Sequence, residues 1–395
     1  CFALLGDANM QVVAKMTDLG ISLTYVQHEH CAVAASMAYA RKTQKVGVSS
    51  VTCGPGLTQI MTALPAAVRA KIPMVIFAGE SPLGKSWYNQ QIEQRPFVEA
   101  TGAKYIQLHT SKRFEQGIQE AFLMAVRERM PVVVGTPFDL LHADTADDPQ
   151  NEPPWYEVYQ GSVSIPSGQS SEIRKLADLL TRAARPIFMA GLGATNLGIA
   201  GQISLLAEKC DALLSTTLPA RGLFHNDPFY LGVSGGFASQ VTRKFLAESD
   251  LIVAFGASIS SHNSDQQRLW PNARVVQITL DPQQFFQGNK VSDQIIVGDV
   301  GHAVSELLNQ IQPCRSINRT PENARLIEQT PIDESDDAEY ADGINPLKAV
   351  KGINQSVPFD WEIVNSSGHC SYYFSHMKNR PFERFLTIRE FGAIG

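Results

Sequence analysis

The acid with the clearest potential for chemistry is Glu29, which stands in the run His28-Glu29-His30 before an alanine-rich stretch. That stretch, residues 30–42, is predicted to form a helix that is apolar nearly all round and therefore buried. Burial penalises a charged carboxylate and raises its pKa, and such an acid suits proton transfer near neutral pH. The alternative interpretation is an ordinary acid at a helix N-terminus, stabilised by the helix dipole.

Three further turns follow short apolar runs on either side of Glu29. The turn Gly54-Pro55-Gly56 has glycines that permit close approach of the backbone to a ligand or another subunit, although it could simply join a strand to a helix. Asn9 ends a small polar turn over residues 6–9. Gln90 lies in the polar cluster 88–94, which is uncharacteristic of a packed element and predicts a loop near a site.

The elements that must position these residues are β-branched runs that alternate with helical stretches, the pattern of βα units and a parallel sheet. In such sheets, ligands bind beyond the carboxyl ends of the strands, where these turns lie. The predicted strands of this first block are Phe2–Leu5, Thr24–Gln27, Val46–Val51, Met74–Ala78 and Val132–Thr136. The predicted helices span residues 30–42, 57–70 and 114–129.

Breaks in the alternation predict three blocks: residues 1–150, 172–315 and 345–395. Two polar connectors separate them, His142–Ser171 and Asp333–Asp342, the second with six acids in ten positions. The expected strands and closing helix of the second block are Pro186–Ala190, Leu213–Thr216, Leu251–Phe255, Arg274–Thr279 and Val300–Ile311. The third block, with a helix Leu347–Ile353 and a strand Trp361–Asn365, has about fifty residues, too few to close a sheet, and is expected to be truncated.

Composition excludes several classes of protein. The chain has 395 residues, of which 44% are hydrophobic and 18% charged, so a disordered chain is not expected. The net charge is −6 and no basic run appears, which argues against nucleic acid as a partner. The six scattered cysteines include no CxxC pair, which predicts reduced thiols and a cytoplasmic protein without a zinc site. No apolar run approaches the ~20 residues that cross a bilayer, so no membrane partner is expected.

Taken together, the motifs resemble the pyrimidine-binding domain of thiamine-diphosphate-dependent enzymes, most closely the acetolactate synthase-like branch. The resemblance rests on His28-Glu29 with its helix and on the segment 54–58 (GPGLT) at the next strand end. The cluster 88–94, the loop 216–224 and the strand 250–257 resemble further family segments, so the likeness spans nearly the whole chain. It implies an α/β protein of tandem doubly wound parallel-sheet domains: a thiamine-diphosphate-binding fold, a Rossmann-like central domain and a truncated diphosphate-binding domain.

The same resemblance implies a lyase or carboligase that acts on a 2-oxo acid or related carbonyl, with thiamine diphosphate and Mg²⁺ as cofactors. A small-molecule substrate and a homodimer or homotetramer are implied as partners. Glu29 would hydrogen-bond N1′ of the aminopyrimidine and favour the tautomer that removes the C2 proton, while the cofactor carries the hard step. The further residues implied are Gly54, Pro55 and Gly56 for cofactor binding and Asn9, His28 and Gln90 for the substrate channel. The turn 6–9 departs from the glycine-rich turn common in acetolactate synthases, so the substrate stays open.

The second block carries a rival signal for nucleotide binding. Gly191 begins a Gly-Leu-Gly run after a predicted strand, but the third glycine of a dinucleotide fingerprint and its downstream acid are missing. Relatives bind FAD, ADP or coenzyme A, or nothing, in this domain. Gly191 and Arg221 are the candidates for a nucleotide or flavin contact, although a surface arginine in a polar loop is the more usual explanation for Arg221.

The third block carries the last candidate residues. Gly368 and His369 follow its first predicted strand, where relatives approach the phosphates, and Ile394 would supply the apolar wedge between the two cofactor rings. The family's metal motif is absent from this chain and is expected beyond Gly395, so the chain is predicted to contain no metal ligands and to be inactive by itself. Two alternatives remain: a non-catalytic nucleotide-binding or regulatory protein, which would have no use for Glu29, and an NAD-dependent oxidoreductase.

Overall fold

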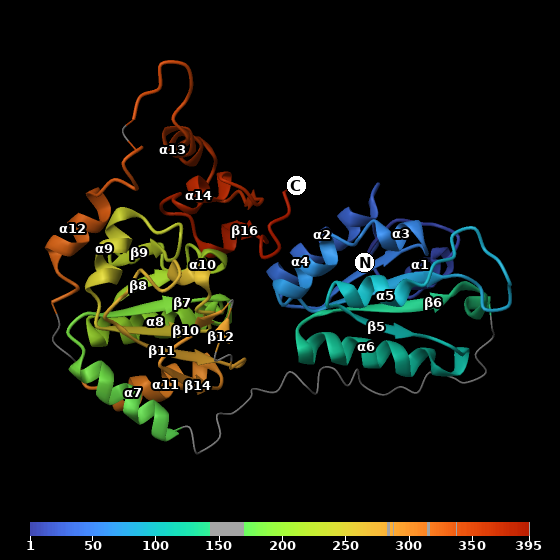
Figure 1. Ribbon diagram of the computed structural model, residues 1–395, viewed down its shortest axis with the longest axis horizontal. Coiled ribbons are helices and arrows are strands. Elements are labelled where there is room, and N and C mark those ends of the chain that lie inside the picture. The colour runs from blue at the N-terminus through green and yellow to red at the C-terminus, as the bar shows by residue number, and fades with distance from the viewer. Residues whose placement is uncertain (143–169, 283–284, 287, 314–316, 337, 395) are drawn as a thin grey trace. The chain divides into compact units, whose positions relative to one another are not determined.

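The computed structural model describes residues 1–142, 170–282, 285–286, 288–313, 317–336 and 338–394 (Figure 1). The chain divides into two compact units. Unit 1 comprises Cys1–Gly161 with Ile388–Gly395, and unit 2 comprises Ser162–Thr387. All but the ends of the predicted connector 142–171 lie outside the described residues. The predicted start of a third domain is divided between these units at residue 387.

Unit 1 contains a six-stranded parallel sheet in the order β2-β1-β3-β4-β6-β5. Its strands are β1 (Phe2–Ala3), β2 (Thr24–Tyr25), β3 (Gly47–Val51), β4 (Met74–Glu80), β5 (Lys104–Gln107) and β6 (Pro131–Pro137). Its helices are α1 (Met10–Asp18), α2 (Glu29–Thr43), α3 (Pro55–Thr58), α4 (Ala63–Arg69), α5 (Gln94–Ala100) and α6 (Phe114–Glu128). Both faces of the sheet are covered, which explains why β4 and β6 read as continuous apolar runs.

Two layers of apolar side chains enclose this sheet. One layer packs α2, α3 and α4 against it through residues such as Val33, Met37 and Leu64. The other packs α1 and α6 through Met16, Ala121 and Ala125. The carboxyl ends of the parallel strands therefore share one edge, and the turns after β1, β2, β3 and β4 meet there.

The predicted helix over 57–70 is wrong, because the chain forms α3 and α4 with turns between them. The hydrogen bonds change there from the helical i−4 pattern to i−3: the amides of Ile60 and Met61 donate to the carbonyls of Leu57 and Thr58 at 3.1 and 3.3 Å. This tighter pattern ends the first short helix before the second begins. The edge strand β5 was not predicted, since its sequence Lys-Tyr-Ile-Gln has too few apolar residues to stand out.

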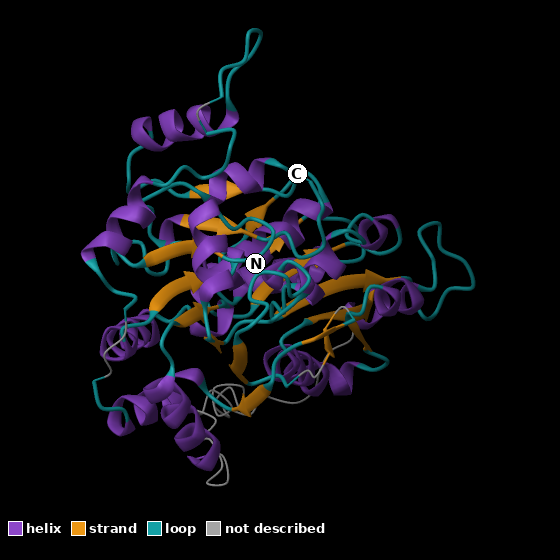
Figure 2. Ribbon diagram, turned by 60° about the vertical axis from the view of Figure 1, so that its left-hand side comes forward, coloured by secondary structure: helices purple, strands orange, loops and turns teal. Residues whose placement is uncertain are grey.

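Unit 2 contains a second six-stranded parallel sheet in the order β14-β11-β10-β7-β8-β9. Figure 2 draws the strands in orange and the helices that surround them in purple. Its strands are β7 (Pro186–Ala190), β8 (Leu213–Thr216), β9 (Tyr230–Val233), β10 (Leu251–Phe255), β11 (Arg274–Thr279) and β14 (Gln294–Val297). The helices around it are α7 (Ser170–Arg182), α8 (Leu197–Cys210), α9 (Gln240–Glu248), α10 (Ser261–Ser264), α11 (Val300–Gln310) and α12 (Pro321–Gln329). A short antiparallel pair, β12 (Phe285–Phe286) and β13 (Asn289–Lys290), joins β11 to β14. Two tandem doubly wound parallel-sheet units confirm the predicted α/β fold class.

The end of unit 2 is a small subassembly built after the central sheet. It comprises α13 (Pro346–Ser356), β15 (Ile363–Asn365), α14 (Cys370–Ser375) and β16 (Phe385–Thr387), and β15 and β16 form a two-stranded parallel sheet. The connector Asp333–Asp342, predicted to be exposed, is partly packed against it. Asp336 is buried, accepts a hydrogen bond from the Ile332 amide and forms an ion pair with Lys351. Its charge is therefore stabilised by ion pairing and not by solvation.

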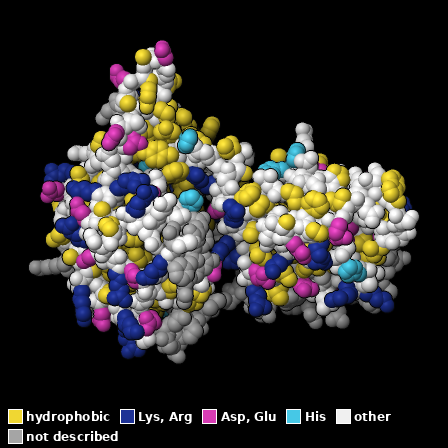
Figure 3. All heavy atoms as spheres, viewed as in Figure 1, with side chains coloured by type: hydrophobic (Ala, Val, Ile, Leu, Met, Phe, Trp, Pro, Cys, Tyr) yellow, Lys and Arg dark blue, Asp and Glu magenta, His cyan; other side chains and the backbone are white. Residues whose placement is uncertain are grey.

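Charged side chains on the drawn face of the molecule do not gather into a basic patch. Lys and Arg are spread over both units and interspersed with Asp and Glu (Figure 3). Contacts with a phosphate backbone need clustered cations, so this face offers no support for nucleic-acid binding.

Candidate active site

Glu29 lies at the carboxyl edge of the first sheet, because the chain turns there from β2 into α2. His28 is the N-cap of α2: its backbone is extended, with φ −152°, and its ring Nδ1 accepts a hydrogen bond from the His30 amide at 3.1 Å. Glu29 is the first helical residue, where the positive end of the helix dipole favours a carboxylate. The Glu29 side chain is half-buried, whereas that of His28 is exposed.

The prediction that α2 is buried nearly all round is wrong for this chain. A single stripe is buried, formed by Ala32, Val33, Ser36, Met37 and Ala40. Away from this stripe, Cys31 is exposed and Tyr39 is 41% exposed to solvent. The sheet covers only the buried stripe, so the desolvation expected for Glu29 is partial within this chain.

The Gly-Pro-Gly turn lies directly beside Glu29. It follows β3 and opens α3, with Pro55 at the first helical position and Gly54 as the N-cap at a positive φ of +57°. A Cβ added at Gly56 would lie 3.4 Å from Glu29 Oε1 and 2.7 Å from Thr52 Cγ2. The structure therefore brings together the two motifs on which the resemblance rests, which are 25 residues apart in the chain.

Gln90 closes the same group of residues. A Cβ at Gly54 would lie 2.1 Å from the Gln90 carbonyl oxygen, so the loop over 88–94 crosses the turn at a distance that only glycine allows. The Cys53 thiol donates to Gln90 Oε1 at 3.4 Å. Burial raises the pKa of Cys53 to about 11, which keeps this thiol protonated and able to donate at neutral pH.

Asn9 was predicted for the substrate channel, and the structure places its side chain inside the fold. Its Nδ2 donates to the Leu4 carbonyl at 3.0 Å and to Ser50 Oγ at 2.9 Å, while its Oδ1 accepts from the Gly6 amide at 2.8 Å. The residue is 1% exposed. Asn9 therefore ties the turn after β1 to β3, and this environment supports a structural role.

Sequence reasoning missed a buried polar group behind the turn. Gln94 Oε1 accepts from the Gly54 amide at 2.9 Å, and Gln94 Nε2 donates to the Gly79 carbonyl at 3.0 Å and to Tyr105 Oη at 3.2 Å. Tyr105 in turn donates to Glu80. The available signal was Glu80 itself, a lone acid at the end of the apolar run that forms β4.

In the central domain, Gly191 is explained by close packing of two strand ends. A Cβ there would lie 2.4 Å from Ala257 Cα, and the Gly191 amide donates to the Phe255 carbonyl at 2.9 Å. Gly193 donates likewise to the Gly256 carbonyl at 3.0 Å. The turns after β7 and β10 therefore need these glycines in order to approach each other, which accounts for the Gly-Leu-Gly run without a nucleotide.

Arg221 is buried and not on the surface. Its guanidinium donates to the carbonyls of Ser375 at 3.2 Å, Arg380 at 3.3 Å and Met377, and it stacks on the Phe385 ring at 4.5 Å from the ring centroid. Burial lowers the Arg221 pKa to about 10, so the group stays cationic at neutral pH. These carbonyls end α14 and the turn after it, and a cation at a helix C-terminus is stabilised by the dipole. The guanidinium predicted for a phosphate or flavin is thus engaged inside unit 2.

Replacing Arg221 by Met should lower the free energy of unfolding by about 3 kcal/mol, because three buried carbonyls lose their shared donor. Urea unfolding of the full-length protein measures this loss. The matched control is Arg268→Met, since Arg268 is 67% exposed in its pair with Asp265 and its loss should cost less than about 1 kcal/mol. Equal losses in the two variants would contradict the structural role assigned to Arg221.

The remaining predicted residues lie at exposed turns. Gly368 adopts φ +108° after β15, and His369 is the exposed N-cap of α14. Ile394 is 80% exposed, in a C-terminal segment held on unit 1. There Glu390 pairs with Arg41 at 3.2 Å, and Phe391 lies under Arg69.

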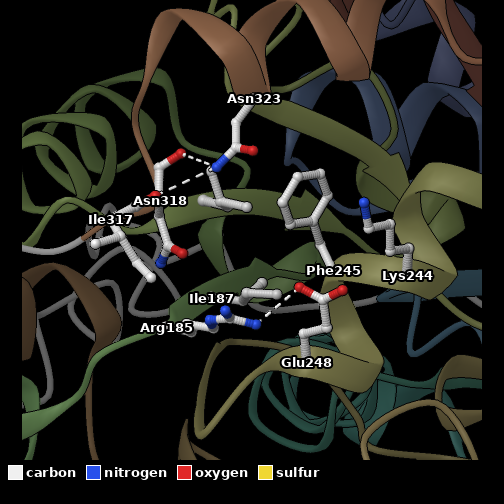
Figure 4. A pocket seen from close by; sticks show the side chains of 9 residues that line it. Arg185, Ile187, Lys244, Phe245, Glu248, Ile317, Asn318 and Asn323 are labelled. Atoms are coloured by element: carbon white, nitrogen blue, oxygen red, sulfur yellow. Dashed lines mark hydrogen bonds and ion pairs between the residues drawn. The ribbon is translucent and has the colours of Figure 1, made fainter.

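A cavity of about 180 Å³ in unit 2 is lined by none of these residues (Figure 4). Its lining includes Ile187 and Leu213, which lie where β7 and β8 begin. The cavity therefore lies at the amino-terminal edge of the sheet, opposite the carboxyl ends of the strands. An ion pair of 2.8 Å between Arg185 and Glu248 lies on its wall. Within the described residues, no group of His, Cys, Asp and Glu side chains is suited to hold a metal ion. None of the helices among these residues could span a membrane.

Comparisons with known proteins agree with this architecture. Residues 1–99 match the family description "Thiamine pyrophosphate enzyme, N-terminal TPP binding domain", and residues 173–307 match "Thiamine pyrophosphate enzyme, central domain". The first match contains Glu29 and the turn Gly54–Gly56. The second covers the sheet of unit 2 from β7 to β14.

Individual relatives are acetolactate synthase large subunits. The chain is 26% identical to the isozyme 2 large subunit of Escherichia coli K12, over 100% of the chain and 70% of the relative. It is 26% identical to the probable large subunit of Methanococcus aeolicus, over 93% and 65%, and 28% identical to that of Parasynechococcus marenigrum, over 94% and 60%. The chain thus spans about two thirds of their length. The paired motifs, the tandem sheets and these matches together show that the chain belongs to the thiamine-diphosphate-dependent enzymes, in their acetolactate synthase-like branch.

Proposed function

We propose that the full-length protein is a carboligase or lyase that uses thiamine diphosphate and Mg²⁺ on a 2-oxo acid or related carbonyl compound. The observation that carries the proposal is the contact between Glu29 and the Gly54–Gly56 turn. The Glu29 carboxylate packs against Gly56 at the carboxyl edge of the sheet, so the two motifs on which the family resemblance rests form one site. The names of the relatives support acetolactate synthase-like chemistry.

The residues at this edge fit the pyrimidine end of the cofactor. When bound, thiamine diphosphate supplies a nucleophilic carbon that also acts as an electron sink. Glu29 would hold a proton at N1′ of the aminopyrimidine, and its half-buried position strengthens that hydrogen bond relative to water. Gly54, Pro55 and Gly56 would carry the backbone surface on which the ring rests. Gln90, fixed against Gly54, would orient the substrate, and His28 would line its entrance.

The diphosphate end of the cofactor is proposed to involve Gly368 and His369, and Ile394 is proposed as the apolar wedge between the two cofactor rings. The positive φ of Gly368 and the amides that open α14 suit close approach of an anion, and the exposed side chain of Ile394 is available to contact the rings. The proposal assigns no flavin contact to Arg221, because its donors serve carbonyls of unit 2. An NAD-dependent reaction is not favoured, since packing accounts for the Gly191 turn.

A homodimer or homotetramer is part of the same proposal. The side of α2 that faces away from the sheet carries partly exposed alanines together with Tyr39. Cover by a second copy would complete the burial of Glu29 that the single chain leaves partial. The cysteines within the described part of the chain form no disulfide with one another, which supports the proposal of a cytoplasmic protein.

Ligand-dependent thermal stability tests the proposal. At ~100 times its dissociation constant a ligand adds about 2.7 kcal/mol to the stability of the folded state, so thiamine diphosphate with Mg²⁺ should raise the melting temperature of the full-length protein by several degrees. Incubation with pyruvate should then release CO₂ or yield acetolactate. Stabilisation by NAD, with none by thiamine diphosphate, would reject the proposal in favour of an oxidoreductase.

A further inference from the structure

We propose that Gln94 is the positioning residue of the cofactor turn, holding Gly54–Gly56 against Glu29 and itself held by Tyr105 and Glu80. This inference rests on the proposed function, because it assigns Gln94 a role in binding the pyrimidine ring. Gln94 is 3% exposed and begins α5, so it acts from behind the turn and does not contact the cofactor.

The hydrogen bonds of Gln94 admit one orientation of its amide. The Gly54 amide can only donate, and it meets Gln94 Oε1 at 2.9 Å. The Gly79 carbonyl can only accept, and it meets Gln94 Nε2 at 3.0 Å. The side chain therefore links the turn after β3 to the end of β4 with fixed polarity, and a flipped amide would lose both bonds.

Tyr105 and Glu80 fix that polarity from the other side. Tyr105 Oη accepts the second Nε2 proton of Gln94 at 3.2 Å and donates its own proton to Glu80. Glu80 also accepts from Gln107 Nε2 at 2.8 Å. Residues of three strands, β4, β5 and β6, surround this series of hydrogen bonds. A Cβ at Gly135 of β6 would lie 2.3 Å from Tyr105 Oη and 2.8 Å from Glu80 Oε1. A closed network of this kind is rigid, because every member has its partner.

The consequence reaches Glu29 through the backbone. Gln94 holds the Gly54 amide, Gly54 adopts φ +57° beneath the Gln90 carbonyl, and Gly56 two residues later lies beside Glu29 Oε1. The buried side-chain amide of Gln94 thus sets the distance between the turn and the Glu29 carboxylate. It also sets the position of Gln90.

The charged groups around Gln94 set the pH dependence of its acidic replacement. Burial raises the pKa of Glu80, nearby Glu93 raises it further and His109 lowers it. Burial and Glu80 raise the pKa of Tyr105, and Arg95 opposes them. Burial likewise raises the pKa of Cys53 at the turn, and nearby Glu80 and Asp7 raise it further. A carboxyl placed at residue 94 would therefore have a raised pKa.

The variant Gln94→Glu tests the proposal by its pH dependence. A protonated carboxyl at residue 94 has one donor and one acceptor, so it can keep the bonds to the Gly79 carbonyl and the Gly54 amide and loses only the bond to Tyr105. The ionised form presents only acceptors to the Gly79 carbonyl. Because the folded-state pKa is raised, the turn should be held at low pH and released as the pH rises through that pKa. The isosteric control is Gln59→Glu, which places the same charge on an exposed side chain at the end of α3.

Two readouts on the full-length protein separate positioning from simple stability. Without cofactor, hydrogen exchange of the Gly54 amide in Gln94→Glu should stay within about threefold of wild type at about pH 5.5 and be about tenfold faster than wild type at about pH 8. The dissociation constant for thiamine diphosphate with Mg²⁺ should rise about tenfold over the same interval. Gln59→Glu should follow wild type at both pH values.

The proposal is overturned if Gln94→Glu melts earlier while its Gly54 exchange and cofactor affinity stay at the values of Gln59→Glu. If Gln94→Glu does not fold, Tyr105→Phe decides: loss of one hydroxyl should accelerate Gly54 exchange about threefold at every pH, and no change rejects the role. Failure of the wild-type protein to bind thiamine diphosphate would refute the proposed function instead, and the exchange measurement would still judge Gln94.

Discussion

Replacing Glu29 by Gln is expected to lower the kcat of the full-length protein by about 100-fold or more, which is the usual contribution of a positioned acid or base. Gln has nearly the same shape but carries no proton that it can exchange with N1′ of the aminopyrimidine. The exchange rate of the C2 proton of bound thiamine diphosphate should fall together with kcat, because both depend on the proton exchanged between residue 29 and N1′. The affinity for the cofactor should change much less.

The fold should survive this change. Glu29 stabilises the start of α2 through the helix dipole, and its loss costs at most about 1 kcal/mol of unfolding free energy. The matched control is Glu115→Gln, because Glu115 is likewise an acid in the first turn of a helix, α6. It should show the same small change in stability and wild-type kcat. Near-normal turnover of Glu29→Gln would remove Glu29 from the mechanism.

The second large effect is expected from Gly54→Ala. The conformation of Gly54, with φ +57° and ψ −107°, is disfavoured for any residue with a Cβ, and that Cβ would lie 2.1 Å from the Gln90 carbonyl oxygen. Strain and displacement of the loop 88–94 should together lower the free energy of unfolding by about 3 kcal/mol. Cofactor affinity should fall as well, because the loop and the turn move apart.

The control for this prediction is Gly201→Ala in α8. Nothing lies within 4 Å of a Cβ at Gly201, so alanine should stabilise the helix by about 0.5–1 kcal/mol. Urea unfolding followed by circular dichroism measures both variants. A Gly54→Ala protein as stable as wild type would show that the turn does not need the geometry described above.

Much of the fold is predictable because buried parallel strands have continuous apolar sequences. The strands β7, β8, β10 and β11 have the bounds predicted from their runs of Val, Ile, Leu and Phe. The edge strand β5 lacks such a run, and the break between α3 and α4 depends on a local change in hydrogen bonding. Neither leaves a periodic signal in the sequence.

The site is predictable only in part, for the same physical reason. Glu29 and the Gly-Pro-Gly turn stand at strand ends, where the topology of a parallel sheet makes them neighbours. The roles of Gln94, Asn9 and Arg221 depend in part on partners far away in the sequence, which are 40, 41 and 159 residues away at Gly54, Ser50 and Arg380. A polar residue in a turn looks the same in a sequence whether it faces a ligand or satisfies buried carbonyls, and packing alone distinguishes the two cases.

The central claim is that Glu29 and the Gly54–Gly56 turn form the pyrimidine end of a thiamine diphosphate site. A crystal structure of the full-length protein with thiamine diphosphate and Mg²⁺ tests it most directly. The account predicts a Glu29 oxygen at about 2.6–2.8 Å from N1′ of the aminopyrimidine, with the ring against the backbone of Gly54–Gly56. A cofactor bound elsewhere, or an aminopyrimidine that does not contact Glu29, would contradict it.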